Sequence, residues 1–197
     1  DVQGGIQLKL KGIIQILRPK QWIKNGFVFA ALIFSGKFMD ISLLQKNIYA
    51  FILFCLTSST IYVLNDIVDI EKDKLHPEKK KRPLPSGLIS KKAAIILDIV
   101  LLIIVISCSF ENNKVFIILL SYIIMNILYS FKLKNVVIID VMIITLGFVM
   151  RVEAGSFATG VAISPWLLLC TMLLSLFLAI NKRKSELITL KGKSSKH

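Results

Sequence analysis

The chain has 197 residues, of which 55% are hydrophobic and 19% charged, and its mean hydropathy is +0.72. A soluble domain of this length would expose too much apolar surface, so the composition predicts an integral membrane protein. The formal net charge is +13, but the basic residues lie between apolar segments, which favours cytoplasmic loops and anionic ligands over nucleic acid. The only histidines, His76 and His197, are too few for a histidine-based metal site.

The first predicted element is an amphipathic helix at residues 6–18, which mix apolar and basic positions and end before Pro19. We expect this helix to lie in the membrane interface. Apolar segments follow at about 22–36, 43–64, 93–110, 115–131, 136–157 and 163–180. A helical span needs about 17–25 residues, so these segments predict six membrane helices, some of them short or tilted. The fold class is therefore all-α, a polytopic transmembrane helical bundle, with residues 1–197 forming a single membrane domain.

Basic residues set the expected orientation of this bundle. They gather in the N-terminal segment, in the loop of residues 65–92 and in the chain after residue 181, whereas the opposite loops hold few of them. Cytoplasmic loops are enriched in Lys and Arg. The N-terminus, the 65–92 loop and the basic tail at 188–197 are therefore expected on the cytoplasmic side of the plasma membrane.

The 65–92 loop is the longest polar break in the chain, and it opens with three aspartates. Asp66, Asp69 and Asp73 are spaced i, i+3 and i+7, so they fall on one face if the helix of residues 43–64 continues past its membrane end. Converging carboxylates repel one another unless a cation lies between them, and hard oxygen ligands suit Mg²⁺. We predict that the three aspartates bind Mg²⁺ and are catalytic, with the amide of Asn65 beside them.

A basic cluster, Lys79 to Arg82, follows the aspartates, and Pro83 and Pro85 end any helix there. A cation site next to ammonium and guanidinium groups suits a diphosphate. The alternative is a solvated loop whose basic residues only set the membrane topology. That alternative leaves the aspartate spacing unexplained.

Several motifs resemble a known family. Asn65-Asp66-x-x-Asp69-x-x-x-Asp73, followed by "RPLPSG" at 82–87, resembles the first aspartate-rich motif of UbiA-type intramembrane prenyltransferases. "RPKQWIKN" (18–25), "YSFKLKNVVIIDV" (129–141) and "NKRKSEL" (181–187) are similar to the branch that makes decaprenylphosphoryl-phosphoribose. The resemblance implies a central cavity in which Mg²⁺ on the aspartates binds a diphosphate. Family members have about nine helices, so six imply a fragment, or a partner or homo-oligomer that closes the cavity.

Ordinary members carry a second aspartate-rich motif after the sixth helix. Here the comparable place has Lys182 and Arg183 with one acid, Glu186, and cations favour direct contact with a phosphate. The resemblance therefore implies transfer of phosphoribose from 5-phosphoribosyl diphosphate to a polyprenyl phosphate, with release of diphosphate. The residues expected to bind substrate are Lys24, Asn25, Asn65, Lys79, Arg82, Tyr129, Lys134, Asp140, Arg151, Lys182, Arg183 and Glu186.

Charges within the fifth apolar segment need an explanation of their own. A charge there costs at least ~2.5–3.5 kcal/mol, so Arg151 is expected to face the bundle interior. It either lines the substrate cavity or is a structural cation held by carbonyls or a carboxylate. Asp140 either orients a ribose or a basic residue, or satisfies the positive end of its helix. Gly147 and Gly155 are expected to allow close approach of neighbouring helices.

Three other functions stay open on the sequence alone. An ordinary prenyltransferase would use an isoprenyl diphosphate donor and an aromatic or other acceptor. A channel or carrier would account for Arg151 and Glu153 but not for the aspartate spacing. A truncated, inactive copy would account for six helices instead of nine.

Overall fold

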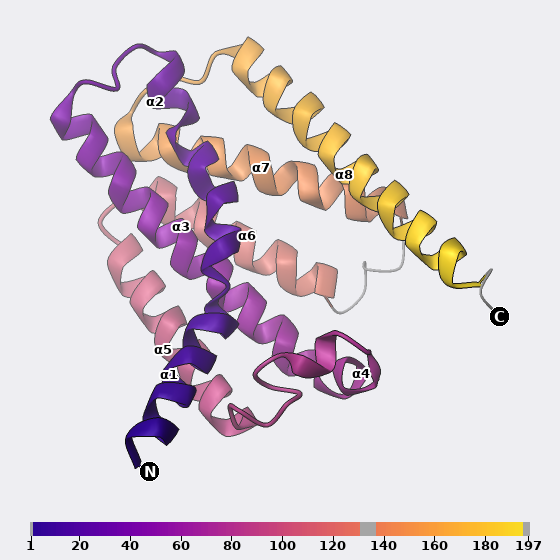
Figure 1. The fold of residues 1–197 in the computed structure, drawn as a ribbon. Coiled ribbons are helices and arrows are strands. Elements are labelled where there is room, and N and C mark those ends of the chain that lie inside the picture. The colour runs from indigo at the N-terminus through magenta and orange to yellow at the C-terminus, as the bar shows by residue number, and fades with distance from the viewer. Residues whose placement is uncertain (1, 131–136, 195–197) are drawn as a thin grey trace.

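The computed structural model is all-helical (Figure 1), which confirms the predicted fold class. It describes residues 2–130 and 137–194, and the side chains of residues 7, 10–130 and 138–185. Within these ranges the elements are α1 (Val2–Leu17), the 3-10 helix η1 (Pro19–Phe29), α2 (Ala30–Phe34), α3 (Ile41–Val68), α4 (Ile70–Leu75), the 3-10 helix η2 (Lys79–Lys81), α5 (Lys91–Ser109), α6 (Asn113–Leu128), α7 (Val137–Thr159) and α8 (Pro165–Ser194).

Three helices in the described part of the chain are long and apolar enough to cross a membrane. They are α3, α5 and the portion of α8 from Pro165 to Ser185, and α6 is apolar but shorter. The first predicted span differs from the expectation of one α-helix, because residues 22–36 fall in η1 and then in α2. Arg18, with a φ of 52°, turns the chain between α1 and η1 just before Pro19.

Side-chain caps explain where three of the helices begin. The Asp40 carboxylate accepts a hydrogen bond from the Leu43 amide at the start of α3 (3.1 Å), and the Ser90 hydroxyl accepts one from the Ala93 amide at the start of α5 (3.2 Å). The Asn112 side chain does the same for the first amides of α6. Each cap satisfies backbone donors that the helix itself leaves unpaired, so these polar residues set the helix starts.

Helix α3 is the central element, since it contacts α1, α5, α6, α7 and η1. Its side chains join a core cluster that includes Val28, Phe54, Val105, Leu119 and Ala154. A second cluster, with Ile16, Val63, Ile70, Leu84 and Ile89, fixes α1 and the segment between α4 and α5 against the other end of α3. The predicted interfacial helix is thus α1, which packs on the bundle through Ile16.

Helix α7 approaches η1 at Gly155. A Cβ at this position would lie 1.7 Å from the backbone oxygen of Val28, so only glycine fits. The expected close approach at Gly155 is therefore confirmed, and it brings Arg151, one turn earlier on α7, next to η1.

Candidate active site

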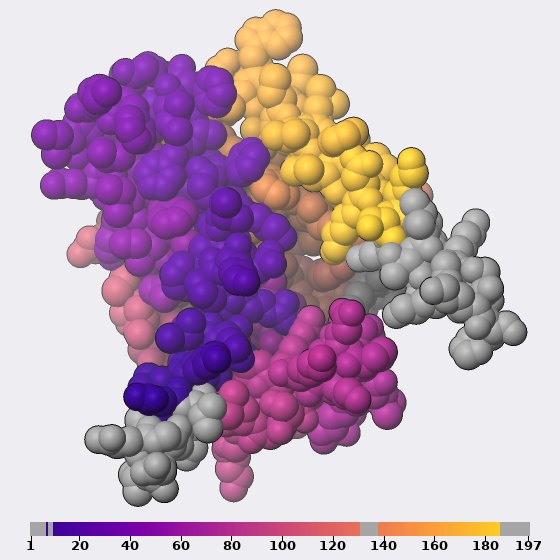
Figure 2. All heavy atoms as spheres, viewed as in Figure 1, coloured from indigo at the N-terminus to yellow at the C-terminus, as the bar shows by residue number. Residues whose placement is uncertain are grey.

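A cavity of about 530 Å³ lies between η1, α6, α7, α8 and the segment around η2. Figure 2 shows the surface hollowed between η1, α8 and the 65–92 segment. None of the described residues that line the cavity is acidic, and six of them are basic: Arg18, Lys24, Lys79, Arg82, Arg151 and Lys182. Such a lining suits a ligand that carries several phosphate oxygens.

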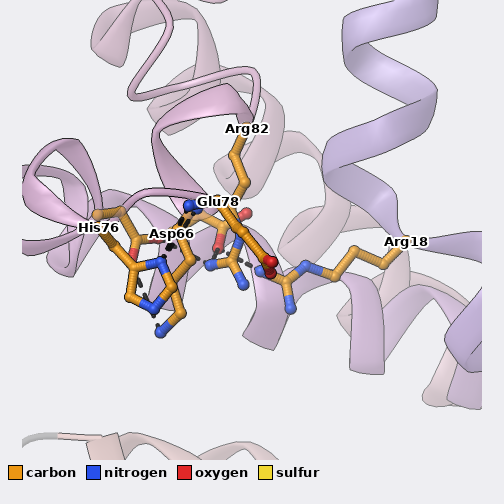
Figure 3. A network of polar contacts seen from close by, with 7 residues as sticks. Arg18, Asp66, His76, Glu78 and Arg82 are labelled. Carbon is orange, nitrogen blue, oxygen red and sulfur yellow. Dashed lines mark hydrogen bonds and ion pairs between the residues drawn. The ribbon is translucent and has the colours of Figure 1, made fainter. Parts of the chain in front are cut away.

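Two buried aspartates lie beside the cavity and pair with its cations. Arg82 Nη1 is 3.3 Å from Asp66 Oδ1 and 2.7 Å from Asp73 Oδ2. Arg18 forms a second ion pair with Asp66, and Lys79 Nζ lies 3.8 Å from Asp73 Oδ1. Figure 3 shows Arg18 and Arg82 directed toward Asp66 from different elements. The aspartates and the cations therefore form one connected network.

The three aspartates do not form the single cluster that their spacing predicts. Among the described residues, no three His, Cys, Asp or Glu side chains are arranged to hold one metal ion. Helix α3 ends at Val68, and Asp69 is the junction between α3 and α4 (φ −92°, ψ 6°), so the regular helix that would align all three is interrupted. Asp66 and Asp73 do come together, through Arg82. The 65–92 segment is also more helical than a loop, since it contains α4 and η2.

The pair Asp66 and Asp73 nevertheless fits a magnesium ion. Both residues are buried, with exposures of 4% and 3%. One nitrogen of Arg82 lies within 3.3 Å of an oxygen from each, so both carboxylates face the same positive charge and would be the residues that hold a metal ion. Hard carboxylate oxygens completed by water and phosphate oxygens are the ligands that Mg²⁺ prefers.

Arg151 combines both of its predicted roles. It lines the cavity, and it is buried and held by hydrogen bonds to the Asn25 side chain (Nε, 2.8 Å), the Gly147 carbonyl (Nη1, 2.6 Å) and the Tyr122 hydroxyl (Nη2, 3.0 Å). Its guanidinium also lies 5.0 Å from the centre of the Phe54 ring. A cation and the face of an aromatic ring attract one another, so this ring helps to stabilise the buried guanidinium.

Asn25 lies behind this wall of the cavity rather than in its lining. The side chain is fully buried, and its amide nitrogen donates to the Ser58 hydroxyl (3.1 Å) and to Cys55 Sγ (3.3 Å). Its oxygen accepts from Arg151. The structure thus gives Asn25 the role of orienting Arg151, in place of the predicted substrate contact.

Asp140 orients a basic residue, one of the alternatives considered for it. It is buried, accepts a hydrogen bond from the Tyr129 hydroxyl, and pairs with Arg183 Nε at 2.6 Å. This contact ties together α7, α8 and the end of α6. Arg183 is therefore engaged by an aspartate, while its neighbour Lys182 lines the cavity.

Six predicted substrate-binding residues line the cavity: Lys24, Lys79, Arg82, Tyr129, Arg151 and Lys182. Asn65 does not, and its side-chain oxygen accepts a hydrogen bond from the Ser130 hydroxyl. Lys134 and the side chain of Glu186 lie outside the described residues.

The sequence interpretation missed several polar residues of the lining. Arg18, Gln21, Tyr62, Tyr122 and Asn126 all line the cavity. Arg18 and Gln21 belong to the quoted "RPKQWIKN" stretch, so the motif itself contained a signal for them. Asn126 is an amide between apolar residues near the end of α6, which is a second signal.

Fold and site together define an integral, multi-pass helical membrane protein with a cation-lined cavity beside a buried pair of carboxylates. The model of the UbiA prenyltransferase family matches residues 26–185. The chain therefore belongs to the UbiA prenyltransferase family.

Relatives of the chain include two phosphoribosyltransferases. It is 38% identical over 184 residues to decaprenyl-phosphate phosphoribosyltransferase of Mycolicibacterium smegmatis, covering 90% of this chain and 58% of the relative. The enzyme of that name from Corynebacterium glutamicum is 35% identical over 184 residues, covering 90% and 55%. A digeranylgeranylglyceryl phosphate synthase of Methanococcus aeolicus is 32% identical over 170 residues, covering 85% and 60%. The chain thus spans less than two thirds of the length of these relatives.

Solved structures share the fold. A digeranylgeranylglyceryl phosphate synthase superposes with a TM-score of 0.69 at 27% identity, covering 87% of this chain and 60% of that one. A UbiA homolog from Archaeoglobus fulgidus bound to DMAPP and Mg²⁺ superposes with a TM-score of 0.72 at 21% identity, covering 86% and 62%.

Proposed function

We propose that this protein transfers phosphoribose from 5-phosphoribosyl diphosphate to a polyprenyl phosphate and releases diphosphate. The observation that supports this most directly is the cavity lining, with six basic residues and no acid among the residues described. The donor carries a diphosphate and a 5-phosphate, and the acceptor carries a monophosphate, so the reaction needs more cationic contacts than a single diphosphate does. The phosphoribosyltransferase relatives support the same assignment.

The network of acids and cations gives the expected division of roles. Mg²⁺ held by Asp66 and Asp73, with Asp69 next to them, would neutralise negative charge on the leaving diphosphate. Arg82, Lys79 and Arg18 lie where they would contact the same diphosphate, and such groups stabilise charge that grows on it as the C1–O bond breaks.

The same cavity has further basic residues that suit the remaining phosphates. Lys24 on η1 and Lys182 on α8 line it, and they are candidates for the 5-phosphate of the donor or the phosphate of the lipid. The acceptor phosphate is already anionic, so it attacks C1 without a strong general base. Arg151, fixed by its hydrogen bonds, would supply a preorganised positive charge in the cavity wall.

The location of the reaction follows from the chemistry of the substrates. The isoprenoid tail stays in the membrane, while the phosphoribosyl donor is soluble in water. We expect the cavity to open on the cytoplasmic side of the plasma membrane, because the basic residues concentrate near it.

The second candidate is a prenyltransferase with an isoprenyl diphosphate donor. It is favoured by the A. fulgidus homolog, whose structure holds DMAPP and Mg²⁺, and by the digeranylgeranylglyceryl phosphate synthases among the relatives. Against it stands the region around Lys182 and Arg183, where basic residues take the place of the second acidic motif. Both candidates use the same diphosphate network and differ in what the diphosphate carries.

A side-by-side transfer assay separates the two candidates. The full-length protein in lipid vesicles is given Mg²⁺, polyprenyl phosphate and either labelled 5-phosphoribosyl diphosphate or labelled isoprenyl diphosphate with a panel of acceptors. We expect a labelled product, separated from the unreacted donor by chromatography, only with the phosphoribosyl donor, and none when Mg²⁺ is chelated. Transfer from the isoprenyl donor, with none from the phosphoribosyl donor, would overturn the proposal.

A further inference from the structure

Arg82 contacts both of the carboxylates that would hold a divalent ion. Its Nη1 atom is 3.3 Å from Asp66 Oδ1 and 2.7 Å from Asp73 Oδ2. We propose that Arg82 is the counter-ion of this acidic pair in the free protein. When the metal binds, Arg82 leaves the carboxylates and binds the diphosphate instead, so that the metal and the diphosphate bind cooperatively. This inference rests on the proposed function of the cavity as a diphosphate site.

The charges around the acidic pair oppose a metal ion that arrives alone. Asp66 and Asp73 are already paired with three cations, Arg82, Arg18 and Lys79. A divalent ion added to the same buried carboxylates would meet these positive charges at short range, where the surroundings screen them weakly. A diphosphate relieves the repulsion, because its oxygens accept hydrogen bonds from the displaced guanidinium and also ligate the metal.

The surroundings of Arg82 give its side chain room to make this exchange. The Arg82 side chain is 33% exposed, whereas those of Asp66 and Asp73 are only 5% and 4% exposed. Arg82 lines the main cavity and also a second cavity of about 390 Å³, which Glu78 and Lys81 line as well. In Figure 3 its guanidinium reaches Asp66 from the chain segment above it. The acids are therefore held in place by packing, and the arginine is the partner with space to move.

The exchange has a measurable thermodynamic consequence. If Arg82 opposes the metal in the free protein and binds the diphosphate in the loaded one, then each ligand tightens binding of the other by the same factor. Removal of the guanidinium should change the two affinities in opposite directions. A residue that only stabilises the fold would weaken both, so the opposite signs identify the exchange.

The test measures ligand binding without turnover. Binding of Mn²⁺ to the full-length protein is followed by electron paramagnetic resonance, with and without inorganic pyrophosphate, for wild type, Arg82→Gln and Lys80→Gln. Lys80 is the matched control, because it is an exposed cation of the same segment that lines neither cavity. For Arg82→Gln we expect Mn²⁺ alone to bind roughly tenfold tighter than to wild type, and Mn²⁺-pyrophosphate to bind roughly tenfold weaker. Lys80→Gln should match wild type in both.

A second variant covers the case in which Arg82→Gln does not fold. Arg82→Lys keeps the charge, but its single ammonium lacks the planar fork of the guanidinium, so this variant should bind Mn²⁺ alone more tightly than wild type does. Unchanged or weaker binding of Mn²⁺ alone in the Arg82 variants that fold would overturn the exchange. That result would leave the proposed transfer reaction intact, since the assay with the two labelled donors tests the reaction separately.

Discussion

Substitution of Gly155 tests whether the close contact between α7 and η1 builds the cavity wall. In Gly155→Ala the new Cβ would lie 1.7 Å from the Val28 backbone oxygen, and real Cβ atoms essentially never approach a neighbour closer than 3.0 Å. The obstacle is backbone, which cannot rotate away as a side chain does. Helix α7 and η1 must therefore separate by roughly 1.3 Å, the difference between these two distances.

This displacement has consequences for both stability and function. Overpacking of this kind costs about 1–3 kcal/mol of folding free energy. Arg151 lies one turn before Gly155, and its 2.8 Å hydrogen bond to Asn25 on η1 spans the same contact, so a shift of this size would break it. We expect the variant to melt at a lower temperature, by about 2–4 °C for each kcal/mol lost, and to bind the phosphorylated substrates more weakly.

The assay compares melting temperature and transfer rate in one detergent for wild type, Gly155→Ala and the control Gly26→Ala. Gly26 also lies in this region of the fold, on η1, but a Cβ there would meet nothing within 4 Å. The control should therefore keep the wild-type melting temperature and transfer rate. If Gly155→Ala melted and reacted like Gly26→Ala, the inferred contact between α7 and η1 would be wrong.

Three further substitutions test individual residues of the site. Asp66→Asn should slow transfer by at least about 100-fold while the protein stays folded, because the neutral amide no longer supports a cation at the leaving group. Near-normal turnover would remove Asp66 from the metal site. Arg151→Met should lower the free energy of unfolding by about 1.5–3 kcal/mol, because the buried Asn25 oxygen loses a charged donor, and a chemical denaturation curve unchanged from wild type would contradict this. Lys182→Ala should raise KM for at least one phosphorylated substrate, and unchanged steady-state kinetics with both substrates would exclude it from phosphate binding.

The sequence predicted the helical bundle and much of the cavity because both depend on local patterns. Apolar segments separated by polar breaks predict helices in a membrane wherever they occur, and a run of basic residues such as Lys79 to Arg82 predicts an anion site with little regard to its exact geometry. The aspartate spacing predicted one cluster of three carboxylates, which the fold does not form, because the prediction assumed a continuous helix. The break at Asp69 could not be read from the periodicity, because the residues on both sides of it are compatible with a helix.

The amino-acid sequence by itself determined that the chain lies in a membrane, that it is helical and which charged residues are available to the site. It did so because hydropathy and charge are properties of the residues themselves. The tertiary structure alone decided which charges meet. It pairs Asp140 with Arg183 and Asp66 with Arg18 across long stretches of chain, and it turns Asn25 from an expected ligand contact into the partner of Arg151. These pairings depend on where helices cross, and the crossing of α7 and η1 depends in turn on a backbone contact that leaves no room for a side chain at Gly155.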